Sequence, residues 1–218
     1  PAASIPAIHT ATIEGLSTAK LIVLVGADPS DRQPIVELRI KKALKAGAKL
    51  AIIGPSLKAL DRFATVRIPV AEGQVEAALN ALLAQLTKSG AAKGLQTESI
   101  KTALDSLYEG YDAGTEFGAE VQQLAGLLEG ADRITYLYDE LTPDVAGNKD
   151  LVATLARLAV VTGQLGEAGV GIGRLTEDNN SWGALDMGIT PGFGPGYTST
   201  TQGLGYQEML GAHGQTPL

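Results

Sequence analysis

Apolar and polar residues follow one another in blocks that predict strands and helices in alternation. Aliphatic runs bounded by turn residues predict strands, and an uninterrupted run is typical of a parallel strand that is buried on both faces. The four predicted strands are Leu21–Val25, Leu50–Ile53, Val66–Val70 and Arg133–Tyr138. Apolar residues spaced by three and four predict helices between them. The pattern therefore predicts an α/β fold, a doubly wound and mostly parallel sheet with flanking helices.

The chain changes character after residue 162. Residues 163–218 are rich in glycine and almost free of helix or strand pattern. We expect an α/β, Rossmann-like domain over residues 1–162 and an extended, irregular segment over residues 163–218 that packs on the domain or on a neighbour. Its "GVGIG" stretch, Gly169–Gly173, follows a helix and is interpreted as a flexible connector. We expect the part through Pro191 to cover the carboxyl ends of the strands, and the remainder to contact a neighbouring domain or chain.

Composition excludes several classes of site. The 218 residues contain no cysteine and two histidines, and the net charge is -7. No disulfide, iron–sulfur cluster or thiolate-bound zinc is therefore expected in this segment, and no metal site is predicted. No long basic run suggests a nucleic-acid partner, and no apolar run reaches the ~18–20 residues of a membrane span. The first residue is Pro1, which suggests a chain cut from a longer protein.

The first candidate site is the loop "VGADPSDRQP", which joins a predicted strand to a predicted helix. A loop at this position holds a phosphate or ribose in many α/β proteins, and the backbone N–H groups at the start of the helix attract an anion. The alternative is an ordinary turn, because Asp28 and Asp31 repel phosphate and the loop has no lysine. The helix begins either at Pro34 or one turn earlier, with a capping box of Ser30 and Gln33.

Two further polar stretches carry candidate residues. Asp139 and Glu140 end the fourth predicted strand and are interpreted as a solvated strand terminus, because successive strand residues point to opposite faces. In "NNSWGALDMG", Asn179 and Asn180 belong either to a ligand-facing loop or to a loop whose amides bond to their own backbone. No arrangement of catalytic residues is predicted.

Three stretches taken in order resemble the molybdopterin oxidoreductases. They are "LIVLVGADPSDRQPIVELRIKKALKAGAKLAIIGP", "VVTGQLGEAGVGI" and "NNSWGALDMGITPG". The resemblance implies a doubly wound domain that binds a guanine nucleotide of the bis-guanylate molybdenum cofactor. The same domain occurs in the large iron–sulfur subunit of respiratory complex I (NADH-quinone oxidoreductase), where it has generally lost the cofactor.

Two departures from the family pattern suggest a vestigial site. The resemblance implies Asp-Pro-Arg after the second strand, where this chain has Gly54-Pro55-Ser56, and Pro-Gly-Thr-Asp after the third, where it has Ala71-Glu72-Gly73-Gln74. Each lost polar partner costs roughly 1–3 kcal/mol. The candidate cofactor-binding residues, on this resemblance, are Gly26, Asp28, Gly54, Ser56, Glu72, Gln74, Asn179 and Asn180.

The main hypothesis is thus a structural and interaction module, part of the molybdopterin oxidoreductase-like domain of that complex I subunit. It would hold no cofactor and no catalytic residue itself, with iron–sulfur clusters elsewhere in the parent chain. Other domains of that chain and other subunits would be its partners, in a cytoplasmic complex peripheral to the membrane. The alternative is the molybdopterin guanine dinucleotide-binding segment of a molybdenum oxidoreductase such as a formate dehydrogenase. A third hypothesis, an independent nucleotide-binding module, leaves the glycine-rich segment without a purpose.

Overall fold

A computed structural model describes most of the chain. The described residues are 9–55, 59–71, 73–89, 102, 104, 106–108, 117–139, 149–164, 166–176, 180–187, 193–194 and 198–199. They belong to two compact units. One runs from Ile8 to Leu175, and the other contains the residues from Thr176 onward. The larger unit therefore extends beyond residue 162, where the composition changes.

The larger unit is built on a five-stranded sheet in which every neighbouring pair is parallel. The strands are β1 (Leu21–Val25), β2 (Lys49–Gly54), β3 (Val66–Pro69), β4 (Ile134–Asp139) and β5 (Gly171–Leu175). Their order is β3-β2-β1-β4-β5. All five residues of β1 are buried, as expected for a central strand covered on both faces. The predicted α/β class and the four predicted strands are confirmed.

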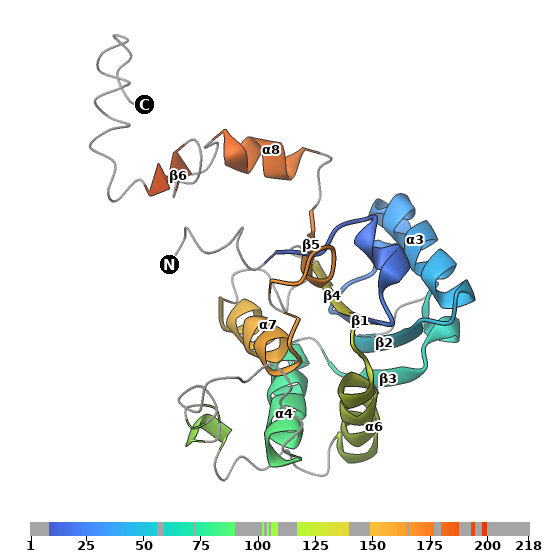
Figure 1. Cartoon of the computed structure of the whole chain (residues 1–218), viewed down its shortest axis with the longest axis vertical. Coiled ribbons are helices and arrows are strands. Elements are labelled where there is room, and N and C mark those ends of the chain that lie inside the picture. Colours follow the sequence, from blue (N-terminus) through green and yellow to red (C-terminus); the bar gives the residue numbers. More distant parts are fainter. Residues whose placement is uncertain are drawn as a thin grey trace. The chain divides into compact units, whose positions relative to one another are not determined.

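Helices cover both faces of this sheet (Figure 1). One face carries the 3-10 turn η2 (Gly15–Thr18), α2 (Pro29–Arg32) and α3 (Pro34–Lys45); the other carries α4 (Val75–Lys88), α6 (Gly118–Gly130) and α7 (Lys149–Val161). The 3-10 turn η3 (Asp61–Phe63) precedes β3. Because strand side chains alternate, Ile22 and Leu24 pack toward α3, whereas Leu21, Val23 and Val25 pack toward α4, α6 and α7. The sheet is therefore doubly wound.

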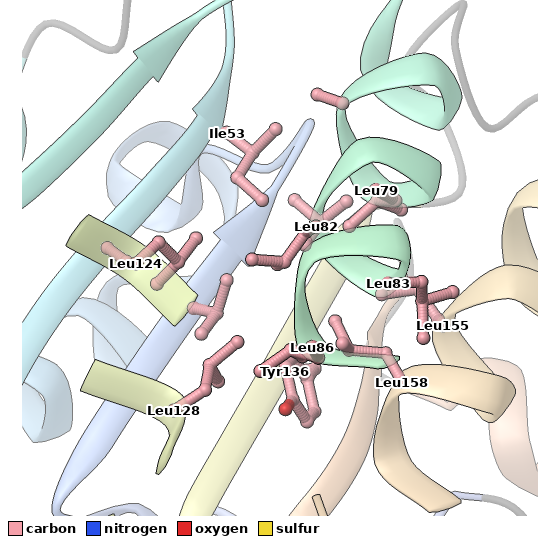
Figure 2. Close-up of a cluster of buried hydrophobic side chains, with 14 of the residues drawn as sticks. Ile53, Leu79, Leu82, Leu83, Leu86, Leu124, Leu128, Tyr136, Leu155 and Leu158 are labelled. Carbon is pink, nitrogen blue, oxygen red and sulfur yellow. The ribbon is translucent and has the colours of Figure 1, made fainter. Parts of the chain in front are cut away.

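The larger core lies between the sheet and helices α4, α6 and α7. Leucines from all three helices meet there over Ile53 and Tyr136, as Figure 2 shows. The leucines labelled in the figure are Leu79, Leu82, Leu83, Leu86, Leu124, Leu128, Leu155 and Leu158. Each is at most 1% exposed. At roughly 1.5–3 kcal/mol for a fully buried large apolar side chain, this layer dominates the favourable energy of the fold.

The loop after β1 forms a short helix before the long one. The Asp28 side chain accepts a hydrogen bond from the Ser30 amide at 3.0 Å and caps α2, which ends at Arg32. Helix α3 then begins with Pro34 at its first position, where the missing N–H costs nothing. The start at Pro34 is thus confirmed, and Asp28 rather than Ser30 supplies the earlier cap.

Strand β5 corrects the interpretation of "GVGIG" as a flexible connector. Most of its residues are buried at the sheet edge, and residues 10–12 lie against its backbone, with the Ala11 amide donating to the Ile172 carbonyl at 3.1 Å. A side chain at Gly173 would overlap Leu137 and crowd Ala11. The glycines are there because another segment packs directly on the strand, and they weaken the apolar pattern that identifies strands.

The smaller unit contains short regular elements. These are helix α8 (Ser181–Asp186) and the antiparallel strands β6 (Phe193–Gly194) and β7 (Thr198–Ser199). The expectation of an irregular segment is therefore incomplete for these residues. The expected packing of this segment over the sheet and against a neighbour stays a prediction. Across the described part of the chain, none of the helices has the length and apolar character needed to cross a membrane.

Candidate functional site

The carboxyl edge of β1 and β2 is formed by backbone alone. Gly26 follows β1 with φ 56°, Gly54 ends β2 with φ 150°, and the Gly26 amide donates to the Ile53 carbonyl at 2.8 Å. A Cβ on Gly54 would lie 3.3 Å from the Gly26 Cα. Glycine is therefore required here for both conformation and space. We call this pair the glycine platform; neither residue carries a side chain that would exclude a ligand, and both are buried in this structure.

This glycine platform lies beside the point where the strand order reverses. From β1 the chain adds β2 and β3 on one side, whereas β4 and β5 lie on the other. Open α/β sheets bind ligands in the crevice at the carboxyl ends of the strands on either side of such a point. The platform therefore occupies the position that general fold rules assign to a ligand.

The turn above the platform offers a hydroxyl rather than a carboxylate. The Asp28 carboxylate is engaged in capping α2. The Ser30 Oγ is buried and has no hydrogen-bond partner among the described atoms. Buried polar atoms are normally paired, so this hydroxyl indicates a place where an additional polar group fits. Asp31 is exposed to solvent.

Asp139, the last residue of β4, is the main residue that the sequence interpretation placed wrongly. It was expected at a solvated terminus, but it is 6% exposed. The pairing of Val25 with Tyr138 sets Asp139 beside Gly26, and its partner on β5 is Leu175. Neighbouring strands on both sides cover it, which the sequence of β4 alone does not reveal.

Tyr138 forms a second polar contact near this edge. Its hydroxyl lies 2.8 Å from the Nε2 of His9, so the segment of residues 9–12 that precedes β1, here called the entering segment, is tied to β4. Burial raises the pKa of Tyr138 to about 12, an effect that the positive charge of Arg174 on β5 partly offsets. The tyrosine is thus neutral at physiological pH and acts as a structural hydrogen-bonding group.

The structure brings four of the candidate residues to one edge. Gly26, Asp28 and Gly54 lie at the ends of β1 and β2, and the exposed Gln74 precedes α4 after β3. Asn180 belongs to the smaller unit, where its carbonyl accepts from the Ala184 amide. The remaining candidates, Ser56, Glu72 and Asn179, lie outside the described residues.

A cavity of about 350 Å³ opens at the opposite, amino edge of the sheet. Lys20 and Lys49 line it together with Gly126 and Gly130 of α6. Helix α6 ends there, and the carboxyl end of a helix carries a partial negative charge that disfavours phosphate. The carboxyl edge is therefore the better candidate for a nucleotide.

Comparison with known proteins identifies the family. The profile of the molybdopterin oxidoreductase family matches residues 5–202, which is most of the chain. This chain belongs to the molybdopterin oxidoreductase family.

Several curated proteins resemble this chain at low identity. The F420-dependent formate dehydrogenase subunit alpha of Methanocaldococcus jannaschii is 25% identical over 206 residues, which are 89% of this chain and 30% of that protein. Formate dehydrogenase H of Escherichia coli is 27% identical over 195 residues, covering 85% and 27% of the two chains. The NADPH-Fe(3+) oxidoreductase subunit alpha of Geobacter sulfurreducens is 28% identical over 215 residues, covering 92% and 24%.

These matches bear on the choice between the hypotheses. The chain spans less than a third of the length of each of these three relatives. Most of the similar proteins carry the name formate dehydrogenase, so the comparisons support the alternative hypothesis better than the complex I hypothesis.

Proposed function

We propose that this chain is the guanine-nucleotide-binding segment of a molybdenum oxidoreductase of the formate dehydrogenase type. It would hold the guanosine diphosphate half of a molybdopterin guanine dinucleotide at the carboxyl edge of the sheet. The observation that carries the proposal is the platform of Gly26 and Gly54 beside the reversal of strand order, in a chain of this family.

The groups present at the platform fit such a ligand. Neither glycine carries a side chain that would exclude a pyrophosphate, although both are buried in this structure. The Ser30 hydroxyl is buried without a partner in the adjoining turn and is suited to donate to a phosphate oxygen. The Asp28 carboxylate caps α2 and keeps a negative charge in this loop, so the Ser30 hydroxyl rather than Asp28 is the group that would meet a phosphate.

The proposed division of labour assigns binding to this chain and redox chemistry to the cofactor. When bound, the molybdenum cofactor supplies the electron transfer to and from substrate. Gly26, Gly54 and Ser30 would position its nucleotide, and the buried core beneath them would keep that position rigid. Oxidation of formate by the parent protein is part of the proposal, supported by the names of the relatives.

A second candidate is the vestigial module of complex I. The observation in its favour is Gly54, which stands where the family resemblance implies an aspartate. Without that carboxylate the edge has one ligand contact fewer, which weakens binding by roughly 1–3 kcal/mol. The two candidates therefore differ in whether a guanine nucleotide binds measurably.

Calorimetric titration of this chain with GDP tests the choice. The proposed function predicts a Kd in the low micromolar range, about -8 kcal/mol. Ser30→Ala should weaken binding several-fold without changing stability, because its buried oxygen has no bond to lose. Ser17→Ala is the matched control, since this exposed serine lies on η2 before β1 and bonds to the Glu14 carbonyl. No binding at millimolar GDP refutes the proposed function and leaves the vestigial module.

A further inference from the structure

Helix α3 carries a second stripe of residues on the side that faces away from the sheet (Figure 1). Its inner side packs on the sheet through Val36, Ile40 and Ala43. Residues spaced by three and four lie on one side of a helix. On the opposite side this spacing gives an outer stripe, which consists of Ile35, Leu38, Lys42 and Lys45. The outer stripe is therefore aliphatic in its first half and cationic in its second.

The aliphatic half of the outer stripe takes no part in the core of this unit. Ile35 is 56% exposed and Leu38 is 60% exposed, and neither belongs to the buried cluster beneath α3. Single exposed apolar side chains are common on protein surfaces, but these two are neighbours on one side of a helix. Adjacent exposed apolar side chains bordered by charged residues are typical of an interaction site. The pair is thus the apolar centre of a candidate contact surface.

The charge around the outer stripe is opposite to that of the whole chain. The chain has a net charge of -7, whereas residues 32–49 contain six basic residues and one acidic residue, Glu37. The Glu37 carboxylate pairs with Lys41 at 2.6 Å. In the described part of the chain, neither Lys42 nor Lys45 lies within ion-pair distance of an acidic side chain. This end of α3 therefore presents positive charge that the unit itself does not compensate.

The two halves of the stripe define the chemistry of a partner. Apolar side chains of the partner would cover Ile35 and Leu38, and its carboxylates would meet the two lysines further along α3. Carboxylates are favoured in the first turn of a helix, so a helix antiparallel to α3 places an acidic amino end beside Lys42 and Lys45. A second copy of this chain fits poorly, because a twofold dimer through the stripe brings two sets of lysines together without a carboxylate.

We propose that the outer stripe of α3 binds an amphipathic helix of a separate protein, acidic at its amino end and apolar at its carboxyl end. A separate protein is favoured over a permanently attached domain, because permanent interfaces are more apolar and their centres are depleted of charge. An anionic membrane is disfavoured, because the acidic remainder of the chain is repelled by such a surface. The contact is therefore reversible and sensitive to salt.

Fluorescence anisotropy with designed peptides tests this proposal. The probe is a labelled helical peptide with glutamates in its first two turns and leucines at helical spacing in its last two; a second peptide has lysines in place of the glutamates. The unchanged chain should bind the acidic peptide at least about tenfold more tightly than the lysine peptide. Replacing both aliphatic residues, Ile35→Ala with Leu38→Ala, should weaken that binding about tenfold, whereas Leu107→Ala, at a residue 55% exposed elsewhere, should not.

Exchange of charge supplies an independent measurement. Lys42→Glu with Lys45→Glu should lose the acidic peptide and bind the lysine peptide, whereas Lys88→Glu at the end of α4 should change neither affinity. Equal affinity of the unchanged chain for the two peptides overturns the proposal even if a variant fails to fold. Failure to bind the acidic peptide at millimolar concentration, or binding that the α3 variants leave unchanged, also overturns it. Binding to phosphatidylglycerol vesicles without binding to the peptide assigns the stripe to a membrane instead.

Discussion

Replacing Gln164 with alanine should destabilise the larger unit more than any exposed substitution of the same kind. The Gln164 side chain is 3% exposed and connects the end of α7 to the beginning of β4. Its Oε1 accepts from the Ile134 amide at 2.9 Å. Its Nε2 donates to the carbonyls of Asp132 at 3.2 Å and Thr162 at 3.0 Å. Alanine removes all three hydrogen bonds at once.

The expected magnitude follows from these three bonds. At about 1 kcal/mol for each buried hydrogen bond, Gln164→Ala lowers the free energy of unfolding by about 3 kcal/mol. For a unit of this size, that corresponds to a fall in Tm of roughly 6–12 °C. Gln164→Glu keeps the acceptor for Ile134 but loses both donations and buries a charge, so it should cost at least as much.

Urea denaturation followed by circular dichroism measures this loss, with Gln122→Ala, exposed on α6, as the matched control. The control should change stability by less than about 0.5 kcal/mol. Hydrogen exchange adds a local measurement, because the Ile134 amide should exchange faster in the variant. A loss equal to that of the control, or unchanged protection of Ile134, would refute the role assigned to Gln164.

Three further predictions concern the packing and titration of this unit. Burial raises the pKa of Tyr138 from 10.0 to about 12, so its contribution to stability is complete below pH 10 and is lost as the pH rises through about 12. Over that interval Tyr138→Phe should lose roughly 2 kcal/mol less of its free energy of unfolding than the unchanged chain. Urea denaturation at each pH measures the two losses, and equal losses contradict this. Gly54→Ala should lower the free energy of unfolding by about 1–3 kcal/mol, because φ is 150° and the new Cβ would lie 3.3 Å from the Gly26 Cα. Gly126→Ala on α6 has open space and should be neutral or stabilising. Thermal denaturation distinguishes the two variants, and equal Tm values count against the strain. Gly15→Ala would overlap the Gly169 carbonyl and should cost at least about 2 kcal/mol, with faster proteolysis of the entering segment; unchanged protease resistance would speak against that close approach.

Much of the fold was predictable because four strands carry uninterrupted apolar runs. The β1 run Leu21–Val25 is buried throughout, and its length and boundaries match the prediction. Strand β5 was missed, because glycines replace apolar residues where the entering segment packs against it. That contact joins residues about 160 positions apart, as in the bond from the Thr10 hydroxyl to the Val170 carbonyl. Local patterns carry no information on such a contact.

The candidate site was predictable only in part, for a related reason. Gly26 was identified from its place after a strand and Gly54 from the family resemblance, and the structure sets them side by side. Asp139 was misplaced because its burial depends on two flanking strands, one of them the unrecognised β5. Tyr138 and His9 likewise meet only through the folded chain, across 129 positions. Residues whose environment comes from distant segments need the structure.

The strand order has a consequence for how this chain is made on the ribosome. Strand β1 is synthesised more than a hundred residues before its partner β4, as the pairing of Leu21 with Ile134 shows. At about 5–20 residues per second, β1 keeps one edge unpaired for on the order of ten seconds of synthesis. An unpaired, wholly apolar strand is a template for association with other chains. Productive folding in the cell therefore depends on shielding the β1 edge of the nascent chain until β4 has left the ribosome.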